Sequence, residues 1–244
     1  MLFRSVTVTG ISISGTDSVN YTVNTSTTTT ANITTKALAV TITASNKTYD
    51  GNTTASVTYA DNRVVGDVFT VSGTATFATK AVGTGKTVTA SSIALTGTDA
   101  ANYAPNSSTT NTANITAKTL AVTITSSGKT YDGLTTATVT YADDRVSGDS
   151  ITVSGTATYA TKAVGSGKTI TASSISVTGT DSGNYTWNTS TTTTANITAR
   201  ALAVTITASN KTYDALTTAS VTYGDNRVAG DTLSIRSEEH TSEL

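Results

Sequence analysis

The chain repeats itself with a fixed period of 82 residues. The sequence Lys-Thr-Tyr-Asp-Gly at 47–51 returns at 129–133 and, with a final alanine, at 211–215. A constant period without insertions means that one structural unit is copied in tandem. A unit of this length exceeds one turn of a solenoid and suffices for a small domain with its own core. We therefore expect an array of similar modules rather than one domain carrying one site.

The period divides the chain into complete and partial copies. The complete units 37–118 and 119–200 are identical at 61 of 82 positions. Segment 6–36 corresponds to the last part of a unit, and segment 201–235 to the first part. Residues 1–5 and 236–244 resemble translated sequencing-adapter arms that are reverse complements of each other, and the three glutamates and the single histidine all lie in the last seven residues. We set both end segments aside as adapter-like sequence in predicting the fold. For the two partial copies we expect frayed or loosely docked ends beside two well-formed central units.

Differences between the two complete units predict which positions are buried. Exchange of one large apolar or aromatic residue for another is what a packed core tolerates. Such exchanges occur at Val88/Ile170, Phe77/Tyr159, Phe69/Ile151 and Leu95/Val177. Exchange for a residue of different chemical character predicts a position in a loop or facing solvent. Such exchanges occur at Asn46/Gly128, Asn52/Leu134, Val65/Ser147 and Pro105/Trp187.

Apolar residues alternate with polar or small residues throughout each unit. The alternation has period two at 38–42, 57–59, 69–71, 75–77, 88–90 and 93–95, and Thr and Val, both strand-forming residues, are abundant there. Glycine-containing segments 82–86 and 96–99 predict turns, and the threonine-rich runs 25–30 and 189–194 predict edge strands or loops. We expect an all-β fold, with six or seven short strands per unit in antiparallel, sandwich-like modules of the Ig-like or β-grasp-like kind and no significant helix.

Composition excludes several classes of function. Outside the adapter-like ends the chain has 13 basic and 13 acidic residues, so we expect no nucleic-acid partner. It has no cysteine and no apolar run that would insert in a membrane. Few lysines and arginines, together with abundant Thr, Ser, Ala and Gly, fit an exported bacterial surface protein.

Candidate chemistry is limited to aspartates, because no His, Cys or Glu lies within the repeats. This composition removes nucleophile–histidine pairs and zinc sites. Asp50 and Asp132 are candidate catalytic acids, but an aspartate that bonds its own backbone before Gly51 or Gly133 explains the motif more simply. A calcium site formed by Asp61, Asp67 and Asp99 is an alternative without the dense spacing of a calcium loop. We expect no enzyme activity, no cofactor and no metal.

The order of the motifs resembles a known repeat family. Lys-Thr-Tyr-Asp-Gly-X-Thr-Thr-Ala is followed by Gly-Asp (66–67, 148–149), by Gly-Thr/Ser-Gly-Lys (83–86, 165–168), by Thr-Gly-Thr-Asp-X-X-Asn-Tyr (96–103, 178–185) and by Ala-Asn-Ile-Thr (113–116, 195–198). This pattern resembles the YDG-type repeat of bacterial exported adhesins and filamentous-haemagglutinin-like proteins. The resemblance implies an extracellular or cell-surface, non-enzymatic, all-β module with no established catalytic residues. Ala215 departs from it by replacing the motif glycine.

These observations predict a structural stalk or spacer of a large bacterial surface or secreted adhesin. The alternative is a repeat module that binds carbohydrate or a host ligand. The expected partners are neighbouring repeats of the same chain, with a host-surface glycan or protein contacted through other regions. We expect Tyr49, Tyr131 and Tyr213 to be partly buried beside the motif turn. The structural motif residues are Tyr49, Asp50, Gly51, Tyr131, Asp132, Gly133, Tyr213 and Asp214.

Overall fold

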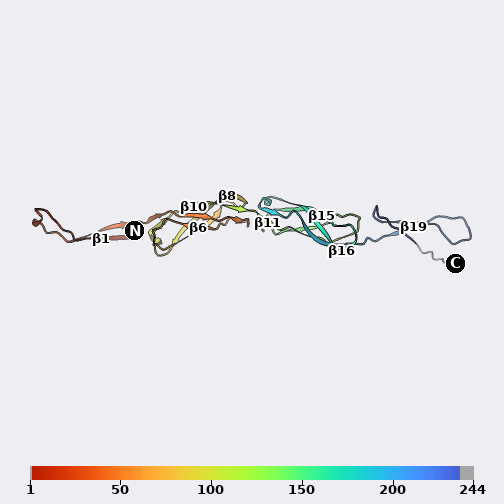
Figure 1. Cartoon of the computed structure of the whole chain (residues 1–244), viewed down its shortest axis with the longest axis horizontal. Helices are drawn as coiled ribbons and strands as arrows, with labels where there is room; N and C mark the ends of the chain where they lie inside the picture. The colour runs from red at the N-terminus through yellow and green to blue at the C-terminus, as the bar shows by residue number, and fades with distance from the viewer. Residues whose placement is uncertain (1, 237–244) are drawn as a thin grey trace. The chain divides into compact units, whose positions relative to one another are not determined.

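A computed structural model describes residues 2–236, with side chains from Arg4 onward. The chain divides into two compact units, Met1–Ala117 and Lys118–Leu244, and each contains one complete repeat and one hairpin (Figure 1). The described residues form an all-β structure, in which the only helical segments are three 3-10 turns of three residues each. No helix within 2–236 is long and apolar enough to cross a membrane.

A four-stranded sheet is the largest element of the first complete repeat. Its strand order is β5-β10-β8-β7, with β10 and β7 antiparallel to β8, and β8 and β10 are labelled in Figure 1. The elements of this repeat are β3 (Lys36–Leu38), β4 (Thr41–Ala44), β5 (Lys47–Thr48), β6 (Val57–Ala60), β7 (Thr70–Phe77), β8 (Gly83–Thr96), η2 (Ala100–Asn102), β9 (Tyr103–Pro105) and β10 (Ser108–Thr116).

Two short ladders, β4-β6 and β3-β9, complete the repeat and enclose its core. Leu38, Val40, Phe69, Ile93 and Tyr103 form one buried cluster, and Tyr59 of β6 packs against it. Residues from both ladders and from the large sheet therefore share a core. The β3-β9 and β5-β10 ladders are parallel. The expected antiparallel arrangement therefore holds for β10, β8 and β7 of the large sheet. The early strands β3 and β5 instead pair in parallel with the late strands β9 and β10.

The second complete repeat has the same topology. Its large sheet has the order β13-β18-β16-β15, with the ladders β12-β14 and β11-β17 beside it. Its elements are β11 (Lys118–Leu120), β12 (Thr123–Thr125), β13 (Lys129–Thr130), β14 (Thr140–Ala142), β15 (Thr152–Tyr159), β16 (Gly165–Thr178), η3 (Ser182–Asn184), β17 (Tyr185–Trp187) and β18 (Thr191–Thr198).

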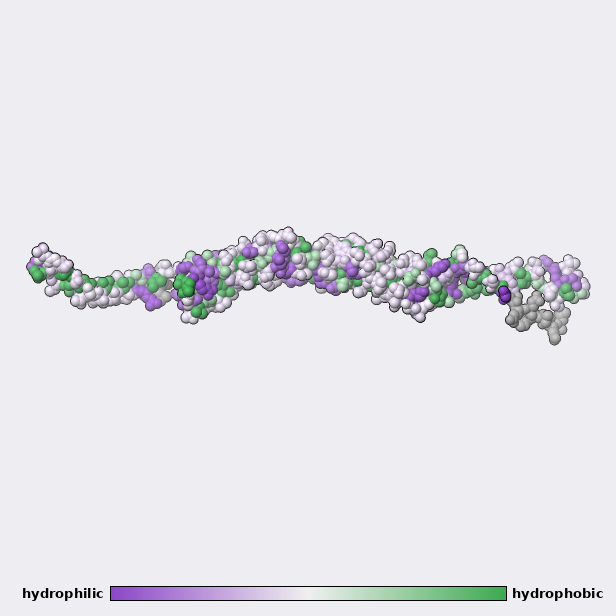
Figure 2. Space-filling model, in the orientation of Figure 1, coloured by the Kyte–Doolittle hydropathy of each residue, from purple (hydrophilic) through white to green (hydrophobic). Residues whose placement is uncertain are grey.

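Each partial copy forms an antiparallel hairpin. The N-terminal hairpin consists of β1 (Leu2–Thr9) and β2 (Ser26–Ile33), with η1 (Ser18–Asn20) between them, and the C-terminal hairpin consists of β19 (Val204–Ala208) and β20 (Val221–Asp225). Apolar side chains remain on the surface of both hairpins, and some of them are visible in green in Figure 2. Part of the N-terminal adapter-like segment belongs to the fold, because Leu2–Ser5 pair with Thr30–Ile33. Residues 237–244 lie outside the described part.

The exchanges between complete units mark the core as predicted. Val88 and Ile170 are fully buried, and Phe77, Tyr159, Phe69, Ile151 and Val177 are at most 7% exposed. Val65 and Leu134, predicted to face solvent, are exposed. Pro105 and Trp187 contradict the prediction for their position, because they are half-buried in β9 and β17, and the Trp187 indole donates to the Ile175 carbonyl at 3.0 Å.

One local prediction is wrong for a reason of strand pairing. The segment 82–86 is no turn: Gly83–Lys86 belong to β8, where the register with β10 shifts between Ala113 and Ile115 as in a β-bulge. Gly85 has φ +59°, a backbone angle that a glycine adopts without strain. The threonine-rich runs form strands, as predicted: Thr191–Thr194 pair with β16, while β13 pairs only with Ile197 and Thr198, and Ser26–Thr30 pair with β1 in a two-stranded hairpin.

Candidate functional site

The Lys-Thr-Tyr-Asp-Gly motif folds into the same turn in all three copies. The lysine ammonium pairs with the aspartate Oδ1 three residues later at 2.7, 2.7 and 2.8 Å in Lys47–Asp50, Lys129–Asp132 and Lys211–Asp214. The same Oδ1 accepts the backbone N–H two residues further on, from Asn52, Leu134 and Leu216, at 3.1, 2.9 and 3.0 Å. An aspartate that binds its own backbone in this way stabilises a turn, as the sequence predicts.

The motif glycine has a left-handed backbone conformation, with φ +80° at Gly51 and +77° at Gly133. The third copy keeps the turn although Ala215 replaces glycine, and Ala215 adopts φ +57°. A Cβ in this region costs about 1–2 kcal/mol. The contacts of Lys211 and Asp214 are therefore sufficient to hold a strained residue in the turn.

The motif aspartates are engaged in structural contacts. The Lys129 ammonium, helped by the Leu134 amide, holds the pKa of Asp132 below its ordinary value, and Lys211 does the same for Asp214. A carboxyl group that acts as a general acid at neutral pH needs a raised pKa. The pKa values of Asp132 and Asp214 are shifted in the opposite direction. The geometry gives Asp132 the role of a turn-forming residue.

The three motif tyrosines lie in different surroundings. Tyr49 is 2% exposed and its N–H donates to the Thr116 carbonyl at 2.8 Å. Tyr131 is half-buried and makes the equivalent bond to Thr198 at 2.9 Å. The predicted burial is wrong for Tyr213, which is 91% exposed. The strand that carries Thr116 or Thr198 in the complete repeats has no counterpart after residue 235 in this sequence.

Tyr131 links its own repeat to the following copy. Its hydroxyl donates to Asp231 Oδ1 at 2.9 Å, and this bond, together with burial, raises the pKa of Tyr131. The loop that carries Asp231 also approaches Gly133, where an added Cβ would lie 2.7 Å from Val228 Cγ1. The motif glycine therefore serves two purposes, a left-handed turn and close packing against the next copy.

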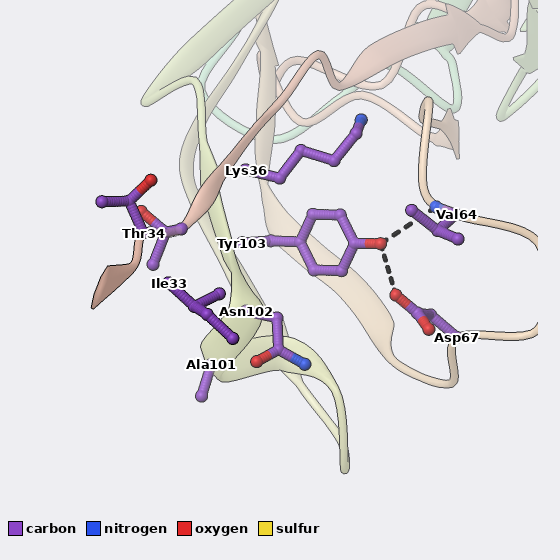
Figure 3. A pocket seen from close by; sticks show the side chains of 9 residues that line it. Ile33, Thr34, Lys36, Val64, Asp67, Ala101, Asn102 and Tyr103 are labelled. Atoms are coloured by element: carbon purple, nitrogen blue, oxygen red, sulfur yellow. Dashed lines mark hydrogen bonds between the residues drawn. The ribbon is translucent and has the colours of Figure 1, made fainter. Parts of the chain in front are cut away.

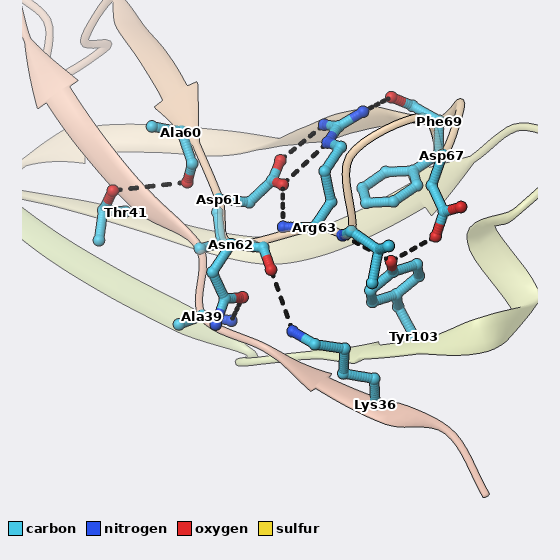
Figure 4. A network of polar contacts seen from close by, with 12 residues as sticks. Lys36, Ala39, Thr41, Ala60, Asp61, Asn62, Arg63, Asp67, Phe69 and Tyr103 are labelled. Carbon is cyan, nitrogen blue, oxygen red and sulfur yellow. Dashed lines mark hydrogen bonds and ion pairs between the residues drawn. The ribbon is translucent and has the colours of Figure 1, made fainter.

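Each complete repeat has an arginine-centred network near the Gly-Asp segment, and Figure 4 shows that of the first repeat. In the first repeat, Arg63 donates to both carboxylate oxygens of Asp61, at 2.9 and 2.6 Å, and to the Phe69 carbonyl at 2.7 Å. Its guanidinium carbon lies 3.8 Å from the centre of the Phe69 ring. Arg63 also lowers the pKa of Asp61, and the corresponding Arg227 lowers the pKa of Asp225 to about 2. Planar guanidinium groups suit such paired bonds.

The Tyr103 pocket lies beside this network in the first repeat (Figure 3). The Tyr103 hydroxyl donates to Asp67 Oδ2 and accepts the Val64 N–H at 2.9 Å. Tyr185 makes the corresponding bonds to Asp149 at 2.5 Å and from Val146 at 2.9 Å. The pocket has a volume of about 450 Å³ and is lined by Ile33, Thr34, Thr35, Lys36, Val64, Asp67, Ala101, Asn102 and Tyr103.

The candidate calcium ligands each make a different protein contact. Asp61 binds Arg63, Asp67 accepts from Tyr103, and Asp99 accepts the Val68 N–H at 2.8 Å. Within the part of the chain that the structure describes, no three His, Cys, Asp or Glu side chains are grouped as metal ligands. These contacts give the three aspartates structural roles.

Sequence reasoning missed a structural asparagine. Asn106 Oδ1 accepts the Val40 N–H at 2.7 Å and its amide donates back to the Val40 carbonyl at 3.2 Å. Asn188 makes the same pair of bonds with Val122. Each asparagine side chain therefore accepts one hydrogen bond from a valine N–H and donates one to the carbonyl of the same valine, as the backbone of a neighbouring strand would. The signal in the sequence is that this asparagine is retained beside the variable Pro105/Trp187 position.

The comparisons with known proteins agree with this tandem arrangement. The family model of the YDG domain matches residues 34–112 and again residues 116–194. No curated protein and no solved structure matches the chain. The two matches together span well over half of the sequence, and each overlaps one complete repeat, beginning three residues before it and ending six residues before its end. The chain therefore belongs to the YDG domain family and carries two copies of the domain in tandem.

Proposed function

We propose that these YDG repeats are a structural stalk or spacer of a large bacterial surface or secreted adhesin. The observation that carries the proposal is the pairing of each repeat's first strands with its last strands. In the first repeat β3 is parallel to β9, and β5 is parallel to β10. Tension applied to the two ends of the repeat then loads both ladders along the strand direction, so that several hydrogen bonds resist together.

The connection between repeats also supports load transfer. β10 ends at Thr116 and β11 begins at Lys118, so that Ala117 alone separates the last strand of one repeat from the first strand of the next. Short connections leave little slack to be extended before the folded repeats carry the load. Structural roles for Asp50, Asp132 and their equivalents are consistent with a non-enzymatic module, and we propose no catalytic residue.

Force spectroscopy on the full chain, held by its two ends, tests this function. We expect two similar unfolding events, each of which releases about 270–295 Å of extended chain for an 82-residue repeat, less the folded length. A chain that extends smoothly, with no force peaks, contradicts a load-bearing role. The control is the same chain pulled through cysteines introduced at Ser72 and Ser91, which lie in the neighbouring strands β7 and β8 of the first repeat. Pulling on neighbouring strands opens their hydrogen bonds one after another, so we expect a lower force.

Carbohydrate or host-ligand binding remains the alternative function. It requires exposed aromatic or amide groups at shared positions, but Trp187 is half-buried and its indole is bonded to Ile175. A glycan array with the full chain separates the two functions. Reproducible binding that is lost on substitution of exposed residues would favour the binding module.

A further inference from the structure

A loop with the same internal bonds occurs in all three copies. Its sequence is Asp-X-Arg-Val-X-Gly-Asp, at 61–67, 143–149 and 225–231. In the third copy Arg227 donates to Asp225 at 2.8 Å and to the Leu233 carbonyl at 2.9 Å. The arginines of the complete repeats make the same bonds, which Figure 4 shows for the first repeat. All of them join residues close in sequence, so the loop closes on local contacts. We call residues 225–233 the Arg-Val loop.

The Arg-Val loop lies against the Tyr-Asp-Gly turn of the second repeat. The Tyr131 hydroxyl donates to Asp231 Oδ1 at 2.9 Å. Gly133 leaves a notch in the turn, where an added Cβ would lie 2.7 Å from Val228 Cγ1. The contact is therefore polar at the tyrosine and apolar at the glycine. Side chains of both copies also line one small cavity at this contact, and they include Tyr131, Val164, Leu202, Val228 and Leu233.

The bond from Tyr131 is compatible with the contacts of a complete copy. In the complete repeats, Asp67 and Asp149 use Oδ2 to accept the hydroxyl of a tyrosine of their own repeat. Asp231 uses Oδ1 to accept from Tyr131. A carboxylate has two acceptor oxygens, each with more than one lone pair. One aspartate at this position can therefore bind a tyrosine of its own copy and a tyrosine of the preceding copy together.

The contact joins segments that are distant in sequence. Tyr131 and Asp231 are 100 residues apart, and Asp231 belongs to the copy after the one that carries Tyr131. The loop is already closed by its own bonds, so docking orders few additional groups and costs little conformational entropy. In tandem repeats, contacts between neighbours add to the intrinsic stability of each repeat. A hydrogen bond to a charged acceptor contributes more to stability than one between neutral groups.

We propose that the Arg-Val loop is a preformed docking element whose partner is the Tyr-Asp-Gly turn of the preceding copy. The loop supplies a carboxylate for the tyrosine hydroxyl and a valine methyl for the glycine notch, and docking stabilises the repeat that carries the turn. A turn with alanine in place of glycine, as at Ala215, has a filled notch and forms a weaker joint. This coupling between neighbours holds whether the array serves as a stalk or as a binding module.

A disulfide across the joint tests the docking, because the chain has no cysteine of its own. A Cβ added at Gly133 lies 3.7 Å from Val228 Cβ, which suits a disulfide. In dilute full chain, Gly133→Cys with Val228→Cys should crosslink about tenfold faster than Gly133→Cys with Ala229→Cys. The second pair is the matched control, because Ala229 is the exposed neighbour of Val228 and both pairs carry the same strain at position 133. Equal rates, or no crosslink in either pair, would overturn the proposal.

Substitutions in the loop should also change the unfolding of the second repeat, to which the loop does not belong. Urea unfolding of the full chain, followed by fluorescence of Trp187, reports this repeat. Asp231→Ala and Tyr131→Phe should each lower the folding equilibrium constant about tenfold, and the double variant no further, because both remove the same bond. Tyr213→Phe is the matched control at the same motif position and should leave the transition unchanged. An unchanged transition for Asp231→Ala, or additive losses, would contradict the coupling.

The notch is tested by Gly133→Ala in two backgrounds. Strain of the left-handed backbone is common to both, whereas the close approach to the valine methyl exists only when Val228 is present. In the same urea experiment, Gly133→Ala should lower the folding constant about threefold more in the parent chain than in a chain with Val228→Ala. Equal losses in the two backgrounds would show that the glycine does not form part of the joint.

Discussion

The motif turn occurs in two settings, at 129–133 in a complete repeat and at 211–215 in a partial one. The local contacts agree closely, since the lysine–aspartate distance is 2.7 Å in the first and 2.8 Å in the second. The tyrosines differ: Tyr131 is half-buried and bonded to Thr198 and Asp231, whereas Tyr213 is 91% exposed. The turn is therefore a local structure, and the burial of its tyrosine depends on strands that are distant in sequence.

Truncation of the motif tyrosine should give the largest difference in stability loss between a complete and a partial repeat. Tyr49→Ala removes a side chain that is 2% exposed, and we expect a loss of about 3–5 kcal/mol in the unfolding free energy of the first repeat. Tyr213→Ala should change stability by less than about 0.5 kcal/mol. Hydrogen exchange at 41–60 and at 204–225 measures both effects in the full chain. Equal losses in the two variants would contradict the dependence on distant strands.

The strand that covers the turn should show the next largest effect. Ile197→Ala removes a residue that is 1% exposed, and we expect destabilisation of the second repeat by about 2–5 kcal/mol. Urea unfolding followed by fluorescence of Trp187, the only tryptophan, reports this repeat. Ile33→Ala is the matched control at the same repeat position, and in dilute solution we expect it to leave the transition unchanged. An unchanged transition for Ile197→Ala would show that β18 does not support the turn.

Replacing the motif glycine by alanine in one copy, and the alanine by glycine in the other, should change the free energy of unfolding by a smaller amount. Gly133→Ala places a Cβ at φ +77° and 2.7 Å from Val228 Cγ1, and we expect a loss of about 1–2 kcal/mol from the backbone alone. Ala215→Gly should be stabilising by about 0.5–1 kcal/mol, because relief of the left-handed strain exceeds the added chain entropy. Hydrogen exchange of the amides of Leu134 and Leu216 gives both values. The comparison fails if the two exchanges change stability in the same direction.

Lowering the pH should reduce the stability of both turns equally, and by less than the substitutions above. The pKa values of Asp132 and Asp214 are lowered in the folded chain by Lys129 and Lys211. Their contribution to stability is therefore present above the unfolded pKa of about 3.9 and is lost as pH falls through the lower folded pKa. The protection factors of the Leu134 and Leu216 amides, taken relative to the intrinsic exchange rate at each pH, should fall over the same acidic range, and Asp132→Asn should remove the step at Leu134 alone. A step confined to one copy would show that the turn is not local.

The two-residue alternation of apolar side chains, and the apolar exchanges between the two complete units, predicted the core well. Leu38, Val40 and Ile42 follow a two-residue period, and all three are at most 4% exposed in the structure. The Asp-Gly turn was predictable for the same reason, because its bonds join residues that are close in sequence. Such features require no knowledge of which strands pair.

The features that depend on pairing were not predictable from local pattern. The segment 83–86 has the composition of a turn, but β10 pairs along it and makes it a bulge. Pro105 and Trp187 are half-buried because they lie in β9 and β17, which pair with the first strand of each complete repeat. Tyr131 and Asp231 are 100 residues apart, and their contact follows from the order of repeats in space.

The strand sequence Thr-Ala-Asn-Ile-Thr is identical at 30–34, 112–116 and 194–198. In the complete repeats this strand pairs with the Lys-Thr of the motif, which is also common to every copy. During refolding, any copy of the motif is thus chemically equivalent as a partner for any copy of the strand. Neighbouring repeats of such similarity are prone to exchange strands and form misassembled intermediates. Synthesis from the N-terminus lets each repeat close before the next is complete, so that the order of synthesis selects the correct partner.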